Sequence, residues 1–327
     1  MLNPKLNLNQ EIFLEDVDTK SNRTGFGEGL LKSGELNANI IALCADLTSS
    51  TKTDLFTNKF PERSVQMGIA EQNMASVAAG MALEGKIPFV ISHAIFNPSR
   101  NWDQIRVSIC LSNLNVKIVG THLGFSNGQD GAVAESLEDV GLMRVLPNLT
   151  VIQPVDAMEA YKATIAATEI SGPVYLRISK ETTPLITTNK TPFEIGKAQI
   201  LSEGKDITII SSGPITYEAL LAAKDLKAKN GIEAEVISCS TIKPLDEKTI
   251  LDSVKKTGKI VTVEEHQIIG GLGSAIAELV SENFPVKLKR IGMKDCFGES
   301  GTYQELKDKY GLNPHNIAKE VINLIKS

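Results

Sequence analysis

The chain has 327 residues, of which 42% are hydrophobic and 22% are charged, and its formal net charge is -5. This length suits about two domains of ordinary size. The negative net charge gives no electrostatic reason to expect nucleic acid or an anionic membrane as a partner. No apolar run approaches the roughly 20 residues that span a bilayer, and residues 1–20 are polar and acidic, unlike a signal peptide. We therefore expect a soluble, cytoplasmic protein.

The four cysteines, Cys44, Cys110, Cys239 and Cys296, are scattered along the chain. No close pair is present that would indicate a zinc site or a disulfide framework. We expect all of them to be buried thiols.

Strands and helices alternate along residues 21–185, after an N-terminal arm at 1–20. We expect strands at 39–44, 87–93, 116–120, 149–152 and 173–177, and helices at 23–34, 70–82, 102–106 and 157–170. This alternation predicts a doubly wound, mostly parallel sheet. The run at 121–131 is too glycine-rich and polar for a regular element, and a long loop inside a compact domain is usually functional.

A threonine- and proline-containing linker at 186–198 is followed by a restart of the same pattern. Residues 199–327 predict a second, smaller α/β domain with strands at 206–211, 234–238, 259–263 and 288–291. The turn at 270–273 lacks both the G-x-G-x-x-G spacing and a Walker lysine, so we interpret it as close packing of a helix on a strand. Glu264, Glu265 and His266 are open to three readings: acid–base chemistry, a solvated charged turn, or a subunit interface.

Glu71 follows a glycine-led turn and begins a helix rich in alanine, which we expect to be buried on most sides. The residues alone leave two readings open. Glu71 either caps the positive end of the helix or has a chemical role. Similarly, Asp46 to Thr51 follow a predicted strand, where sites in open α/β sheets tend to form, but the same residues also suit an ordinary capping turn.

Several segments together resemble transketolase. They are Ala45-Asp46-Leu47-Thr48, Gly68-Ile69-Ala70-Glu71-Gln72-Asn73-Met74, the loop at 120–131, and residues 137–139 and 144–148. The Gly-Ile-Ala-Glu-Gln element is typical of thiamine diphosphate enzymes, which include transketolases and the β subunits of 2-oxoacid dehydrogenases. Residues 96–106 resemble split transketolases, in which two short chains replace one long chain. The resemblance implies a pyrimidine-binding domain followed by a transketolase C-terminal domain, which together form the C-terminal half of the enzyme.

The resemblance also implies a cofactor site. The glutamate at the position of Glu71 hydrogen-bonds the aminopyrimidine ring of thiamine diphosphate and stabilises its imino tautomer, which requires a carboxyl group in a poorly solvated pocket. Phe96 is expected to stack on the pyrimidine, and His93 is a second candidate for that wall. Asp46 and Ile69 are also expected at the cofactor.

The family holds Mg²⁺ and the diphosphate through a Gly-Asp-Gly motif that this chain lacks. Mg²⁺ requires oxygen ligands, so we expect no metal ligand in this chain. The resemblance instead implies an N-terminal partner subunit that supplies them, in a hetero-oligomer built on a dimer.

The family's sugar-phosphate contacts correspond to Arg23, Ser50, His122 and Lys180, and Asp130 corresponds to an acid that recognises a sugar hydroxyl. Lys180 replaces an arginine and keeps the charge but loses the bidentate fork. Val133 and Ala134 replace the family's usual threonine and donor-binding histidine. A lost hydrogen bond of this kind costs roughly 1–3 kcal/mol, so the donor is expected to be atypical unless Glu135 substitutes for the histidine.

These features predict the C-terminal subunit of a transketolase that moves a two-carbon ketol unit from a ketose phosphate or related donor to an aldose, active only with its partner. One alternative is a relative that decarboxylates 2-oxoacids or transfers acyl groups, as Val133 and Ala134 suggest. Another is a non-catalytic pairing subunit.

Overall fold

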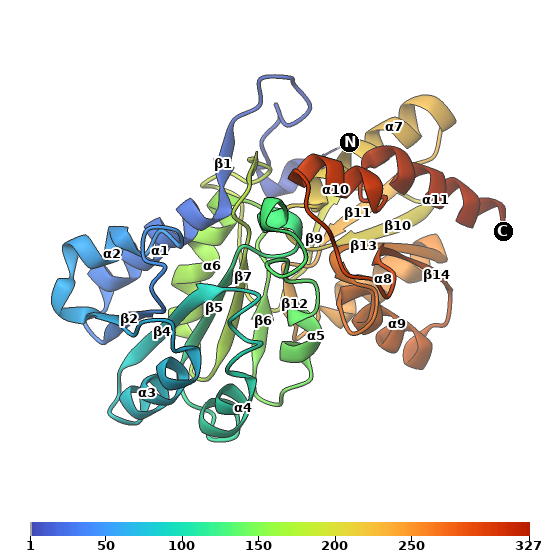
Figure 1. Ribbon diagram of the computed structural model, residues 1–327. Coiled ribbons are helices and arrows are strands. Elements are labelled where there is room, and N and C mark those ends of the chain that lie inside the picture. The colour runs from blue at the N-terminus through green and yellow to red at the C-terminus, as the bar shows by residue number, and fades with distance from the viewer. Residues whose placement is uncertain (1) are drawn as a thin grey trace.

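Short apolar runs separated by helices form two mostly parallel sheets in the computed structural model, which describes residues 2–327 (Figure 1). The first residue of the predicted N-terminal arm therefore lies outside the described part. The larger sheet has seven strands in the order β12-β6-β7-β5-β4-β2-β3. Its strands are β2 (Ile40–Cys44), β3 (Ser64–Gln66), β4 (Ile87–His93), β5 (Lys117–Thr121), β6 (Thr150–Ile152), β7 (Val174–Ile178) and β12 (Thr241–Lys243).

Helices cover both faces of the larger sheet. Successive residues of a strand point to opposite faces, and in these apolar strands both sets of side chains are buried. On β4, Phe89 packs in the core shared with α1 and α6, whereas Val90 packs in the core shared with α3. The helical elements of this part are α1 (Asn22–Leu36), α2 (Asp54–Lys59), η2 (Pro61–Arg63), α3 (Glu71–Leu83), α4 (Trp102–Gln104), the π-helix η3 (Ile105–Cys110), the 3₁₀ helix η4 (Phe125–Asp130), α5 (Asp139–Arg144) and α6 (Ala157–Glu169).

The smaller sheet has five strands in the order β14-β13-β10-β11-β9. Its strands are β9 (Gln199–Ser202), β10 (Ile207–Ser211), β11 (Ala234–Ser238), β13 (Lys259–Gln267) and β14 (Lys287–Met293). Its helices are α7 (Thr216–Asn230), α8 (Glu247–Thr257), α9 (Leu272–Asn283), α10 (Tyr303–Lys309) and α11 (Pro314–Lys326). Two short elements, β1 (Thr19–Ser21) and β8 (Thr182–Pro184), form a separate antiparallel pair, and η1 (Pro4–Leu6) lies near the N-terminus.

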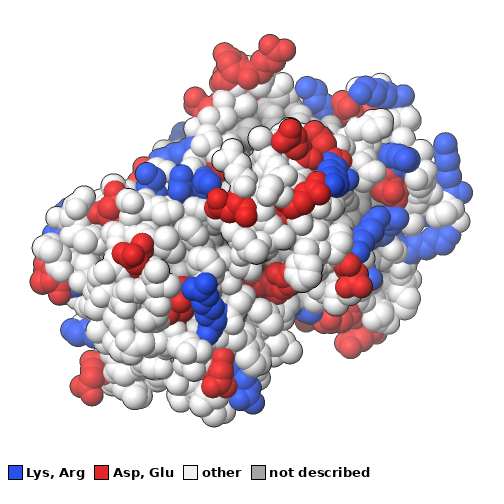
Figure 2. Space-filling model, viewed as in Figure 1, with Lys and Arg blue, Asp and Glu red and all other residues white. Residues whose placement is uncertain are grey.

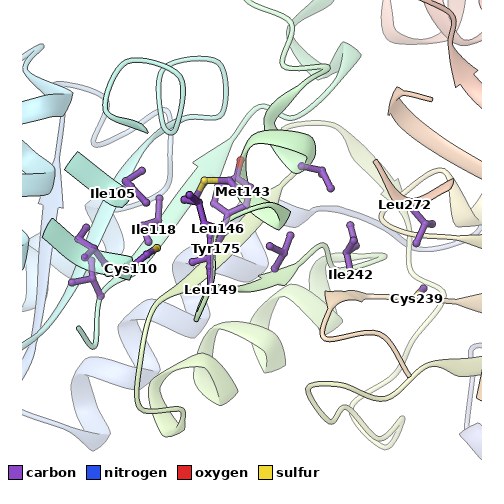
Figure 3. Close-up of a cluster of buried hydrophobic side chains, with 14 of the residues drawn as sticks. Ile105, Cys110, Ile118, Met143, Leu146, Leu149, Tyr175, Cys239, Ile242 and Leu272 are labelled. Atoms are coloured by element: carbon purple, nitrogen blue, oxygen red, sulfur yellow. The ribbon is translucent and has the colours of Figure 1, made fainter. Parts of the chain in front are cut away.

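The two parts of the chain are joined by a strand, β12, that crosses from the second part into the larger sheet, which the sequence did not predict. β12 comes from the second half of the chain but pairs antiparallel with β6, placing Thr241 opposite Ile152. The buried core is continuous across this junction, where Leu149 and Tyr175 share a cluster with Ile242 and Leu272 (Figure 3). The predicted fold class is confirmed, while the predicted boundaries at 185/186 and 198/199 stay predictions.

Most predicted elements are present within a few residues of their expected ends, but three expectations are wrong. Helix α3 is buried along one face only, because it lies on the outside of the sheet, and Ser76 and Gly80 are exposed on its other face. Cys296 is exposed, although the other three cysteines are buried. The loop at 121–131 is not wholly irregular, since it contains η4.

Glu264, Glu265 and His266 lie inside β13 and are buried, so the reading of a solvated turn is wrong. The Glu264 Oε1 atom accepts a hydrogen bond of 2.9 Å from the Gly273 backbone N–H at the start of α9. Burial raises the pKa of Glu264 to about 7. The glycine-rich turn at 270–273 is therefore closed by the chain's own carboxylate, in agreement with helix–strand packing.

Charged side chains are interspersed over the face seen in Figure 2, with wide uncharged areas over the part that contains α3 and α4. Within residues 2–327, no helix combines the length and the apolar character needed to cross a membrane.

Candidate active site

The predicted site residues gather where neighbouring parallel strands end. Ser50 follows β2, His93 ends β4, His122 directly follows β5, and Lys180 follows β7. These four strands are adjacent in the order β7-β5-β4-β2. Their carboxyl ends therefore meet at one edge of the sheet, which is the usual position of a site in an open α/β fold.

Glu71 is the first residue of α3 and only 4% exposed. The turn before it depends on Gly68, whose φ of 70° lies in the left-handed region that glycine adopts without strain. The carboxylate of Glu71 has one side-chain partner in the described chain, the Nη1 atom of Arg100, at 3.4 Å from Oε1 and 3.5 Å from Oε2. A buried acid is thus held beside a single, loosely placed cation.

Arg100 also covers the ring of Phe96. Its guanidinium carbon lies 4.1 Å from the ring centroid, and its side chain is 50% exposed. The flat guanidinium thus stacks on Phe96 while directing an N–H toward Glu71. The Phe96 ring and the Glu71 carboxylate together can therefore contact a flat group that carries a donor on its edge.

Two buried asparagines that the sequence analysis missed hold the Phe96 segment in place. The Nδ2 group of Asn97 donates to the carbonyls of Val90 and Val119, at 2.9 and 3.0 Å. The Nδ2 group of Asn101 donates to the Glu71 carbonyl at 3.2 Å and to Asn97 Oδ1 at 3.0 Å. In the sequence they are only two asparagines four residues apart in a predicted loop. Their role is visible only when the positions of β4, β5 and the start of α3 are known, because their hydrogen-bond partners lie there.

His93 and His122 stack on each other, with ring centroids 3.7 Å apart, and both contact Ser50. The Ser50 Oγ atom lies 3.2 Å from His93 Nε2 and 3.3 Å from His122 Nε2. Burial, together with the charges of Lys180 and Arg23, lowers the pKa of His93 to about 4. Burial, followed by His93, Arg23 and Lys180, lowers the pKa of His122 to about 2. Both rings are therefore neutral at pH 7.

The cations of the site flank this histidine pair. Arg23 Nη1 donates to the Ser50 carbonyl at 2.8 Å, and its buried Nε has no partner within residues 2–327. Lys180 Nζ donates to Asn127 Oδ1 at 3.3 Å. Asp130 is exposed, and its charge opposes the lowering of the His93 pKa. Asn127 is a further site residue that the sequence analysis missed.

Asp46 and Ile69 are less closely tied to these groups. Both are exposed, Ile69 at 74%. No hydrogen bond or ring contact in the described chain links their side chains to Glu71 or Phe96. Their predicted contact with a cofactor stays a prediction.

Residues from both halves of the chain fix the loop that carries Asp130. Arg177 is fully buried and donates from Nη2 to the carbonyls of Ser136 at 2.9 Å and Glu265 at 3.1 Å. The Ser136 carbonyl also accepts from the Gly124 N–H at 2.9 Å, which closes the base of the loop.

The Glu265 side chain fixes the start of this loop, next to its base. Its Oε1 atom accepts from the Phe125 N–H at 2.7 Å, and its Oε2 atom accepts from the Tyr303 hydroxyl at 2.8 Å. The buried strand β13 therefore helps to shape a loop of the other sheet.

Glu135, next to the Val133 and Ala134 positions that depart from the family pattern, is a buried acid without a hydrogen-bond partner in the described chain. Val133 is 81% exposed, whereas Glu135 is 2% exposed and neither of its carboxyl oxygens has a hydrogen-bond partner in the described chain. Burial, followed by the nearby charge of Glu265, raises the pKa of Glu135 to about 7. The carboxyl group lies against Gly298, where a Cβ atom would collide with Oε2.

The transketolase pyrimidine binding domain matches residues 18–185, and the transketolase C-terminal domain matches residues 196–317. The chain belongs to the transketolase family. It is 44% identical to the "Putative transketolase C-terminal section" of Methanocaldococcus jannaschii, over 94% of this chain and 97% of that protein. It is 43% identical to the "6-deoxy-6-sulfo-D-fructose transketolase subunit SqwH" of a Clostridium species, over 90% of this chain and 89% of that protein.

A solved structure, "Split gene transketolase, inactive beta4 tetramer", superposes on this transketolase chain with a TM-score of 0.88 and 44% identity, covering 94% of this chain and 98% of that one. Transketolases depend on thiamine diphosphate. Glu71 and Phe96 offer a buried carboxylate and an aromatic ring that Arg100 contacts together, the kinds of group that an aminopyrimidine ring needs. Arg100 already shows that a planar, nitrogen-bearing group can stack on Phe96 and present an N–H to Glu71.

Proposed function

We propose that this chain is the C-terminal subunit of a thiamine diphosphate-dependent transketolase. Together with an N-terminal partner subunit, it transfers a two-carbon ketol unit from a ketose with an anionic end to an aldose. The observation that carries this proposal is the buried carboxylate of Glu71 beside the Phe96 ring, at the same sheet edge as the Ser50, His93 and His122 cluster.

The proposed role of Glu71 is to hold a proton shared with the aminopyrimidine. Its burial excludes water that would compete for this hydrogen bond, and its rigid position at the start of α3 keeps the carboxylate oriented. Phe96 would hold the ring by stacking. When bound, thiamine diphosphate would supply the carbanion that attacks the ketose carbonyl.

The proposed role of Arg23 and Lys180 is to bind the anionic end of the sugar. Lysine holds an anion as a point charge and does not require the planar geometry that favours arginine. The Clostridium relative is named for a ketose that carries a sulfonate, 6-deoxy-6-sulfo-D-fructose. A sulfonate or a phosphate donor is therefore compatible with the cations of this site.

A partner subunit is supported by the split-subunit relatives and by the missing Gly-Asp-Gly motif. The solved split-gene structure is that of a β4 tetramer described as inactive. We propose that the Mg²⁺ ligands come from the N-terminal partner and that the working assembly contains both subunits. The partner is to be identified by co-purification with this chain.

The test is a donor assay on the purified two-subunit complex with D-ribose 5-phosphate as acceptor. D-xylulose 5-phosphate, 6-deoxy-6-sulfo-D-fructose and pyruvate are supplied in turn as donors. Consumption of a ketose supports the proposal, whereas consumption of pyruvate alone would show that the chain is a 2-oxoacid-processing relative.

A matched pair of variants tests the role of Glu71. Glu71→Ala should lower turnover by orders of magnitude. Glu84→Ala, an exposed acid at the other end of α3, should leave it unchanged. Unchanged turnover in Glu71→Ala would instead support a non-catalytic pairing subunit.

A further inference from the structure

We infer that His93 binds substrate, with its Nδ1 atom accepting a hydrogen bond from a hydroxyl group of a polyhydroxy compound. This inference rests on the proposed function because it names a sugar as the ligand of the same site. It gives His93 a role different from the cofactor wall considered above.

The four contacts in the chain around His93 can all be hydrogen bonds at once in only one direction. The Thr121 hydroxyl donates to the Ser92 carbonyl at 3.3 Å and lies 2.9 Å from His122 Nδ1. A hydroxyl has a single proton, so Thr121 must accept from the N–H at His122 Nδ1. In the neutral ring of His122, Nε2 is then an acceptor.

The same reasoning continues through Ser50 to His93. The Ser50 hydroxyl donates its proton to His122 Nε2, so it can only accept from His93, and His93 Nε2 carries the proton. The neutral His93 ring is left with a bare nitrogen at Nδ1. Within residues 2–327, no hydrogen bond reaches this nitrogen.

The surroundings of His93 favour a hydroxyl over other ligands at Nδ1. The centroid of the His93 ring lies 3.7 Å from that of His122 and 6.0 Å from that of Phe96. Its closer ring contact is therefore with His122, a predicted substrate residue, and not with the predicted cofactor wall. Because burial, followed by the charges of Lys180 and Arg23, keeps the ring from taking a proton, Nδ1 stays an acceptor. A bare lone pair repels an anion but accepts a hydroxyl proton, while the two cations suit the anionic end of the same molecule.

The test compares two amide variants in the complete two-subunit complex. In His93→Asn the side-chain amide lies near the former Nδ1, whereas in His93→Gln it reaches toward the former Nε2. Isothermal titration measures binding of D-ribose 5-phosphate, inorganic phosphate and thiamine diphosphate without requiring turnover.

We expect His93→Gln to weaken D-ribose 5-phosphate binding about tenfold or more, the usual effect of a lost hydrogen bond to a polar ligand. His93→Asn should stay within about threefold of the wild type, since it keeps an acceptor near Nδ1. Affinities for phosphate and thiamine diphosphate should be unchanged in both variants.

Equal effects of the two variants on D-ribose 5-phosphate would overturn the inference, as would failure of the wild-type complex to bind this sugar. Loss of thiamine diphosphate affinity alone would show that His93 is a cofactor wall. Because binding is measured separately from turnover, a complex that shows the expected pattern but transfers no ketol unit would refute the proposed function and leave the inference intact.

A second measurement is independent of any substitution. The chain contains four histidines, so their ring nitrogens can be assigned in a ¹⁵N-histidine-labelled sample. The inference requires a proton on Nε2 and none on Nδ1 of His93 at pH 7. A protonated Nδ1 would overturn it.

Discussion

Replacing Arg177 with methionine should destabilise the protein strongly, because it leaves a buried carboxylate without its counter-charge. Arg177 and Asp139 are both fully buried, and the guanidinium binds the carboxylate through Nε at 2.6 Å and through Nη2 at 2.9 Å. Removing one partner of such a pair costs about 3–5 kcal/mol. After the change, Tyr175 remains as a donor to Asp139 at 2.7 Å but brings no charge.

The pH dependence of this loss has a defined sign. Burial by itself would raise the pKa of Asp139, but Arg177 outweighs burial and holds that pKa below its ordinary value. The pair therefore stabilises the fold above the unfolded pKa of about 3.9 and loses this contribution as the pH falls through the folded pKa. In Arg177→Met, the Tyr175 hydrogen bond still lowers the pKa of Asp139, but burial is no longer opposed by the Arg177 charge and raises it. Protonation therefore relieves the buried charge as the pH falls. The loss should be smaller at pH 5 than at pH 7.

The assay is urea unfolding of wild type and Arg177→Met at both pH values, with Arg106→Met as the control at an exposed arginine. The double variant Asp139→Asn/Arg177→Met should recover part of the loss, because no unpaired charge remains. A loss below about 1 kcal/mol at pH 7, as expected for an exposed pair, would refute the reasoning.

Three further changes test other parts of the site. Arg100→Ala should raise the affinity of the two-subunit complex for thiamine diphosphate by up to about fivefold, since a half-exposed ion pair is worth at most about 1 kcal/mol; weaker binding by calorimetry would instead show that Arg100 holds the cofactor. Glu135→Gln should become more stable relative to wild type as the pH rises from 5 to 8. Burial raises the folded pKa of Glu135 to about 7, so wild-type stability falls by up to about 1.4 kcal/mol per pH unit between the unfolded and folded pKa; parallel melting temperatures would contradict this. Gly124→Ala should lower the melting temperature, because φ is 52° and a Cβ would collide with Glu265, whereas Gly80→Ala, where a Cβ meets nothing within 4 Å, should not.

The sequence placed His93 at the end of one predicted strand and His122 just after another, but it did not predict that the two strands are neighbours. The parallel pairing of β4 with β5 brings the two rings together. Glu71 at the head of its helix was also readable, because the turn and the helix are local features.

Other parts depend on contacts that no local pattern encodes. Asp139 and Arg177 are 38 positions apart and meet only after the loop folds onto β7. Glu265 lies 140 positions from Phe125, so a buried acid in one sheet could not be matched in advance to a loop of the other. The exposed half of α3 was mispredicted because alanine favours a helix without specifying which sides are covered.

The crossing of β12 into the larger sheet limits how the two halves of this protein can be combined with halves of other proteins. A fragment ending before residue 241 would leave β6 as an unpaired sheet edge, and such edges promote association with other chains. In a hybrid whose second half comes from a relative, the relative's strand at the position of β12 would have to pair with Val151 and Ile152 of this protein. The rest of that half would still have to form the smaller sheet. The two halves are therefore expected to change together during evolution, and engineered hybrids should exchange β6 and β12 as one unit.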